Sequence, residues 1–142
     1  MEDLVFETTE GEPKPEDFKV ITDGLLAYHA SHGHPREKEK YSIFLKDDKG
    51  KIYGGIIVTF SFNLMHIDQL WIDEMLRGKH YGTQLMEMVE KEAIKRGCTI
   101  SCTDTFSYQA PKFYENLGYA IYGKLEDFPE GSSLIYYYKK LK

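Results

Sequence analysis

The stretch Leu70–Thr83 constrains the fold of this chain more than any other segment. It reads as a strand of apolar and aromatic residues, then a short polar loop, then directly a helix. Gly78 and Gly82 lie in the loop and the first helical turn, and Arg77 and Lys79 add two positive charges. N–H groups at the start of a helix have no intrahelical partners, and the positive end of the helix dipole lies there, so such a loop suits a phosphate. The alternative is an ordinary strand-to-helix connection, because two glycines alone are weak evidence.

The other elements predicted from hydrophobic periodicity alternate in type. Strands are expected at 4–8, 41–46, 51–60, 64–72, 99–104, 119–125 and 133–140, and helices from about residue 16, at 83–96 and at 109–117. The three consecutive strands between 41 and 72 suggest an antiparallel meander. This order predicts a single domain over residues 1–142, of the α/β or α+β class, with a mixed sheet.

Charge and composition exclude several classes of function. The formal net charge of −5 argues against nucleic acid as the main partner and is compatible with a cationic amine. The acidic N-terminus lacks a signal-peptide pattern, and no apolar run reaches the ~20 residues that a membrane helix needs. We therefore expect no membrane partner and a cytoplasmic location. Cys98 and Cys102 are too few for a disulfide framework or a zinc site, and we expect buried thiols.

Two motifs carry a resemblance to a known family. The loop resembles the acetyl-coenzyme A loop of the GNAT superfamily of N-acetyltransferases, which runs Arg or Gln, two residues, Gly, one residue, then Gly or Ala. Arg77 and Gly82 match its ends, whereas His80 stands at the middle glycine. Histidine tolerates left-handed backbone dihedrals better than most residues. The second motif, at 110–119, is similar to the family's Ala-x-x-Phe-Tyr-x-x-Leu-Gly-Phe/Tyr segment and follows the loop in the same order.

The resemblance implies an acetyl-coenzyme A-dependent N-acetyltransferase with a mixed, mainly antiparallel central sheet flanked by helices. It implies transfer to a primary amine of a small molecule or peptide by direct attack in a ternary complex. The expected cofactor-binding residues are Trp71, Ile72, Asp73, Arg77, Gly78, Lys79, His80, Tyr81, Gly82 and Thr83. The first three would pair through their backbone with the amide-rich pantetheine arm, as an added strand pairs with a sheet edge.

Catalytic roles follow from the same resemblance. Tyr114 occupies the position of the family's general acid, and a tyrosine pKa near about 10 suits proton donation to a thiolate. His66 lies near the position of the family's general base, and Asp68 projects from the same face of the strand. The alternatives are a tyrosine packed in the core and a histidine that is hydrogen-bonded within the sheet.

His29, His32 and His34 form a cluster after the first predicted helix, with Tyr28 nearby, where the resembled fold builds its acceptor pocket. We expect that substrate pocket to be lined by Tyr28, His29, His32 and Asp68. We expect no metal there, because no cysteine or carboxylate completes a ligand set with the histidines. The aromatic last strand suggests a homodimer formed through an exposed sheet edge. Two alternatives to an enzyme remain: a catalytically silent acyl-coenzyme A sensor or interaction module of the same fold, and an acidic interaction domain unrelated to coenzyme A.

Overall fold

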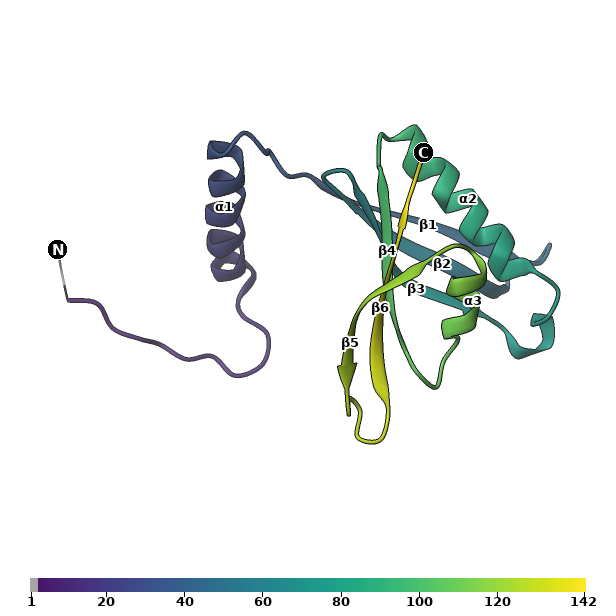
Figure 1. The fold of residues 1–142 in the computed structure, drawn as a ribbon. Coiled ribbons are helices and arrows are strands. Elements are labelled where there is room, and N and C mark those ends of the chain that lie inside the picture. Colours follow the sequence, from purple (N-terminus) through teal and green to yellow (C-terminus); the bar gives the residue numbers. More distant parts are fainter. Residues whose placement is uncertain (1–2) are drawn as a thin grey trace. The chain divides into compact units, whose positions relative to one another are not determined.

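A computed structural model of the chain describes residues 3–142. By their contacts they divide into two compact units, one ending at Arg36 and the other spanning Glu37–Lys142 (Figure 1). Within the described part, no helix is long and apolar enough to cross a membrane. The organisation of residues 1–142 as a single domain stays a prediction.

The first unit holds one regular element, helix α1 (Pro15–Ser31). It begins with a proline, whose missing N–H costs nothing in a first turn, and Glu16 and Asp17 complement the positive end of the helix dipole. The predicted strand at 4–8 is wrong, because these residues are exposed and pair with no strand.

The second unit is a six-stranded sheet with helices. Its strands are β1 (Lys38–Lys46), β2 (Ile52–Ser61), β3 (Leu64–Ile72), β4 (Ile100–Phe106), β5 (Ala120–Glu126) and β6 (Ser133–Lys140), in the order β1-β2-β3-β4-β6-β5. Its helices are the 3-10 helix η1 (Glu74–Leu76), α2 (Tyr81–Lys95) and α3 (Pro111–Asn116). All neighbouring strands are antiparallel except β3 and β4. The mixed, mainly antiparallel sheet is confirmed.

The aromatic last strand does not lie at an edge of the sheet. β6 pairs with β4 on one side and with β5 on the other, so the edges are β1 and β5. The argument for a homodimer through an exposed last strand is therefore wrong, since that strand already has two partners.

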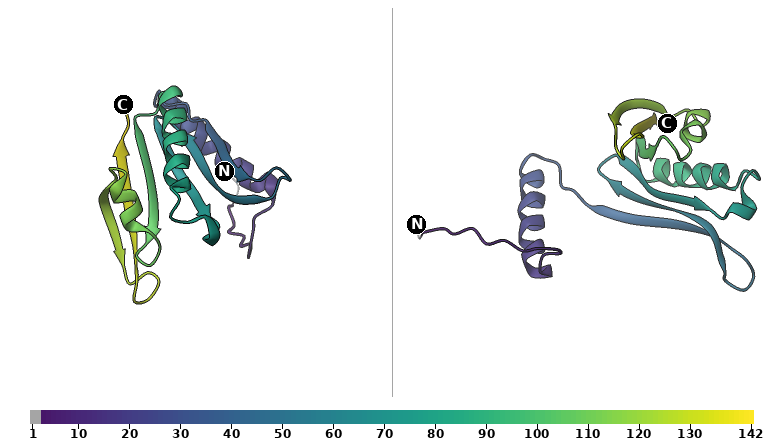
Figure 2. Two further views of the ribbon diagram at one scale, coloured as in Figure 1. Left: turned by 90° about the vertical axis from the view of Figure 1, so that its right-hand side faces the viewer. Right: turned by 90° about the horizontal axis from the view of Figure 1, so that it is seen from below.

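Helix α2 covers one face of the sheet (Figure 2). Its buried side chains, Leu85, Met86, Val89 and Ala93, recur at helical spacing, as the sequence predicts. They belong to a core cluster with alternate residues of β2 and β3, which are Ile56, Val58, Phe60, Met65 and Ile67. Because side chains alternate along a strand, the residues between these, including His66, belong to the opposite face.

The sheet forks between β3 and β4. Their parallel pairing covers only Leu64–His66 against Ile100–Cys102, although the strands continue to Ile72 and to Phe106. On the other side of β3 the register with β2 shifts after Ile57, which leaves Asp68 as an extra residue in the ladder. Such bulges re-aim side chains and are common beside functional sites.

Candidate active site

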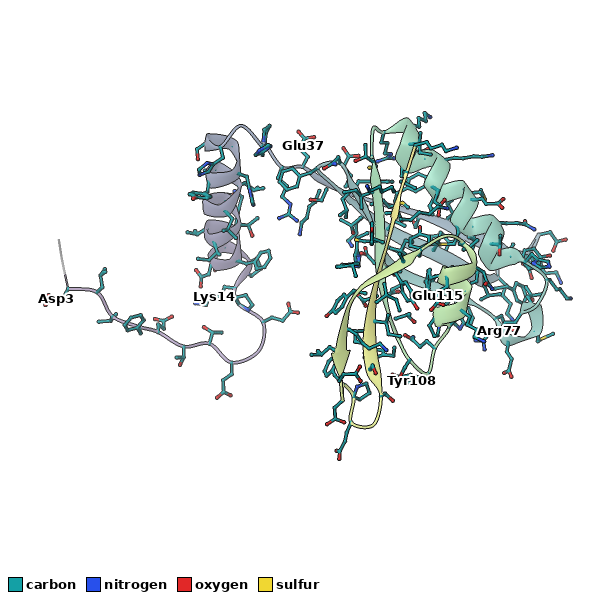
Figure 3. All side chains as sticks on the ribbon, viewed as in Figure 1. Asp3, Lys14, Glu37, Arg77, Tyr108 and Glu115 are labelled. Atoms are coloured by element: carbon teal, nitrogen blue, oxygen red, sulfur yellow. The ribbon has the colours of Figure 1, made fainter. Side chains whose placement is uncertain are left out.

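A cavity of about 840 Å³ lies in the fork. Its walls come from β3, the loop after β3, the first turn of α2, β4 and the start of α3. Figure 3 labels two of its lining residues, Arg77 on the loop that leads into α2 and Tyr108 on the loop that follows β4. Of the ten cofactor-binding residues predicted from the sequence, all but Asp73 and Lys79 line this cavity.

The loop before α2 presents backbone donors to the cavity. Among the described residues, the N–H groups of 78–83 have no backbone acceptor, and the first such bond in the helix runs from Gln84 N–H to the His80 carbonyl. The first turn carries no acidic residue. The unpaired N–H groups and the positive end of the helix dipole are therefore not neutralised by a carboxylate in the first turn, which favours an anionic ligand at this end of the cavity.

His80, which stands at the motif's middle glycine, has a left-handed backbone conformation. It is the N-cap of α2 with φ 66° and ψ 18°, in the left-handed region, and its side chain makes no capping hydrogen bond. Gly78, two residues earlier, also has a positive φ of 78°. His80 therefore adopts a left-handed conformation that histidine tolerates better than most residues.

Gly82 is needed for close packing between α2 and α3. A Cβ at this position would lie 3.3 Å from two ring atoms of Phe113. Such a distance is tighter than ordinary van der Waals contact, so the ring would have to shift. Glycine thus lets the first turn of α2 approach the start of α3, and both line the cavity.

The free edge of β3 forms another wall. Beyond Ile67, whose carbonyl accepts a hydrogen bond from the Thr103 hydroxyl at 3.1 Å, no described strand pairs with this edge. Trp71 and Ile72 lie along it and line the cavity. Asp73 does not line the cavity: its N–H donates to the Tyr53 carbonyl and its carbonyl accepts from Leu76 N–H, and its part in cofactor binding stays a prediction. Its carboxylate accepts from Met75 N–H and caps η1.

Tyr114 is both a core residue and a wall of the cavity. Its side chain is buried and packs against Tyr119 and Tyr137, with ring centroids 5.8 and 6.0 Å away. Burial raises the pKa of Tyr114, a hydrogen bond with the Thr103 side chain lowers it, and the charge of Asp104 raises it, with a net upward shift. The hydroxyl therefore keeps its proton at neutral pH.

His66 contacts two carboxylates that line the cavity. Its Nδ1 is 2.6 Å from Asp68 Oδ1, and its Nε2 is 3.6 Å from Asp104 Oδ2. Asp68 also accepts hydrogen bonds from Thr59 and Lys40. Burial raises the pKa of Asp68, but these hydrogen bonds outweigh burial, and the net shift is downward. His66 does not itself line the cavity, whereas Asp68 and Asp104 do.

Sequence reasoning missed Asp104. The one sequence feature that could have indicated Asp104 as a site residue is its position as a lone acidic residue at the end of a predicted strand. In the parallel register His66 faces Cys102, so Asp68 and Asp104 are the next residues on the same face as the two strands part. The sequence cannot show that these two strands are neighbours.

Cys102 is unsuited to act as a nucleophile. Both cysteines are buried thiols without a disulfide, as predicted. Burial, followed by the charges of Asp104 and Asp68, raises the pKa of Cys102 to about 11. Because the thiolate is the reactive form, this environment opposes a covalent cysteine intermediate.

The predicted acceptor-pocket residues Tyr28, His29 and His32 belong to the first unit. The rings of Tyr28 and His32 contact each other, with centroids 4.5 Å apart. Their role in an acceptor pocket stays a prediction. Over residues 3–142, no group of three or more histidines, cysteines and carboxylates is placed to hold a metal ion.

Comparison with known proteins identifies the class. The model of the Acetyltransferase (GNAT) family matches residues 3–119. The chain therefore belongs to this family and is an N-acetyltransferase.

Individual relatives agree with this assignment. The blasticidin-S acetyltransferase of Streptomyces morookaense is 32% identical over 97 residues, which are 68% of this chain and 71% of that protein. The crystal structure of an acetyltransferase from Bacillus cereus has a TM-score of 0.83 at 35% identity and covers 94% of this chain and 98% of that one. An aminoglycoside 6'-N-acetyltransferase complexed with coenzyme A shares the fold, with a TM-score of 0.64 at 19% identity over 72% of this chain and 73% of that one.

Proposed function

We propose that the protein transfers the acetyl group of acetyl-coenzyme A to a primary amine of a small molecule, by direct attack in a ternary complex. The observation that carries this proposal is the forked cavity, which joins a phosphate-binding helix start, a free strand edge and a buried tyrosine. The names of relatives that act on blasticidin S and on aminoglycosides support a small-molecule acceptor. We place the reaction in the cytoplasm, as the sequence predicts.

The cofactor would lie along the fork. Its pyrophosphate would accept hydrogen bonds from the N–H groups of 78–83, with Arg77 adding positive charge. Its pantetheine arm would pair with the free edge of β3 beside Trp71 and Ile72. An N–H group of the same edge would polarise the thioester carbonyl and stabilise the oxyanion.

The chain's own groups would move two protons. The amine nitrogen attacks the thioester carbonyl, the C–N bond forms, and the C–S bond breaks. Tyr114 donates a proton to the departing sulfur. His66, held with Nδ1–H towards Asp68, takes one proton of the ammonium at Nε2 through water before the attack. The second nitrogen proton leaves to solvent after the attack, and Tyr114 regains from solvent the proton that it gives to the sulfur. The raised pKa of Cys102 supports direct attack over an acetyl-cysteine intermediate.

Release of free thiol tests the proposal. Purified protein is incubated with acetyl-coenzyme A and a panel of primary amines, and thiol formation is followed with and without each amine. The proposal requires amine-dependent thiol release. Cofactor binding without release for any amine favours the silent acyl-coenzyme A module, and absence of binding excludes a coenzyme A-dependent function.

A further inference from the structure

Asp104 has a charge that the protein itself does not neutralise. Among the described residues no donor makes a hydrogen bond to its carboxylate, and its only ion-pair neighbour is His66 Nε2 at 3.6 Å. Asp68, the other carboxylate in the cavity wall, accepts from three side chains. The side chain of Asp104 is 43% exposed, so it remains in contact with solvent. An unmatched carboxylate in a cavity wall is suited to pair with a cationic ligand.

Tyrosines stand beside Asp104 on the same face of the sheet. Tyr136 is its direct cross-strand partner on β6. Tyr122 contacts the rings of Tyr136 and Tyr138, with centroids 5.9 and 5.8 Å away. Tyr122 is 58% exposed, so this ring is open to a ligand. Burial, then the neighbouring Cys102 and Asp104 groups, raise the pKa of Tyr122.

A carboxylate next to open aromatic rings favours an organic cation. The carboxylate attracts the charge, while the ring faces attract it through their quadrupole and cover its apolar part. The reacting amine, however, must be neutral when it attacks, and a carboxylate held against it would oppose loss of its proton. The group at Asp104 is therefore a different one from the attacking amine.

We propose that the acceptor carries a second cationic group, which Asp104 binds with Tyr122 and Tyr136 while the other amine is acetylated in the fork. This inference rests on the proposed function and narrows its substrate class to doubly charged amines. Asp104 acts as a specificity-determining residue, because it binds a part of the acceptor that does not react.

Matched probes test the proposal. Putrescine and n-butylamine have the same carbon chain and differ by one cationic group, as do cadaverine and n-pentylamine. KM is measured for each amine with saturating acetyl-coenzyme A, and binding of each amine to the coenzyme A-saturated protein is measured by calorimetry. The variants are Asp104→Asn, Asp104→Glu and, as a control for net charge, Glu87→Gln on the exposed side of α2.

The wild type is expected to bind the diamines about tenfold more tightly than the monoamines. Asp104→Asn should abolish this preference with acetyl-coenzyme A affinity unchanged, Asp104→Glu should restore part of it, and Glu87→Gln should leave it intact. A wild type without diamine preference in either assay, or an Asp104→Asn variant that keeps it, overturns the proposal. Thiol release with equal efficiency for both amine classes would refute this inference alone, whereas failure to bind acetyl-coenzyme A would refute the proposed function.

Discussion

Replacing His80 by glycine should stabilise the protein, although histidine is the native residue. His80 is held at φ 66°. A left-handed conformation costs a non-glycine residue roughly 1–2 kcal/mol, with histidine at the lower end because it is enriched there. Glycine removes this cost but adds roughly 0.5–1 kcal/mol of backbone entropy to the unfolded chain. Since the side chain is exposed and makes no capping bond, the net gain is roughly 0–0.5 kcal/mol.

Gly78 supplies the matched opposite change. It has φ 78°, and an added Cβ would meet no atom within 4 Å, so Gly78→Ala changes only the backbone preference. That variant should lose about 0.5–1 kcal/mol. Urea unfolding then measures a difference of about 1 kcal/mol between the two variants, with acetyl-coenzyme A affinity in His80→Gly close to that of the wild type. A His80→Gly protein less stable than Gly78→Ala would refute the reasoning about the loop backbone.

Three further predictions concern the site. Tyr114→Phe should lower kcat by about tenfold to a hundredfold with little change in acetyl-coenzyme A affinity, measured by steady-state kinetics and calorimetry, because it removes the proton donor and keeps the ring; unchanged turnover with chemistry rate-limiting would exclude that role. Gly82→Val should destabilise the protein by about 1–3 kcal/mol and weaken acetyl-coenzyme A binding, because even an added Cβ would lie only 3.3 Å from ring atoms of Phe113. Normal acetyl-coenzyme A binding by calorimetry would contradict a cofactor site at the start of α2. The pKa of Asp68 is lower in the folded protein than in the unfolded chain, so the carboxylate contributes to the free energy of unfolding at pH values above its unfolded pKa, and this contribution is lost as pH falls through the folded pKa. Asp68→Asn should therefore flatten the acid side of the curve of unfolding free energy against pH, measured by urea titration. An unchanged acid side would show that the carboxylate makes no net contribution to stability.

Local patterns in the sequence sufficed to predict most elements and to name eight residues that line the cavity, whose roles in cofactor binding stay predictions. The β3 strand, the glycine loop and the stripe of α2 follow from residue periodicity and from the lack of N–H partners at a helix start, which are local properties. Tyr114 could be placed because its motif surrounds it directly. The N-terminal strand at 4–8 was wrong, because a run of apolar residues does not show whether a neighbouring strand exists.

Strand order and the fork could not be predicted in this way. They depend on which distant segments become neighbours, and a single sequence does not record such pairings. Asp104 can be recognised as a residue of the site only once β4 is known to pair with β3. The last strand is an inner strand of the sheet because β5 pairs with it, and the sequence does not show this pairing. His66 fits the expected strand position, but it contacts the cavity-lining carboxylates of Asp68 and Asp104 and does not line the cavity itself.

Hydrogen–deuterium exchange with and without acetyl-coenzyme A tests the central claim that the fork between β3 and β4 is the cofactor site. Backbone amides are followed by mass spectrometry over the whole chain. The account predicts that the cofactor slows exchange most at residues 78–83 and along the free edge of β3 near Trp71 and Ile72. Protection confined to other segments, or none at saturating cofactor, would contradict it.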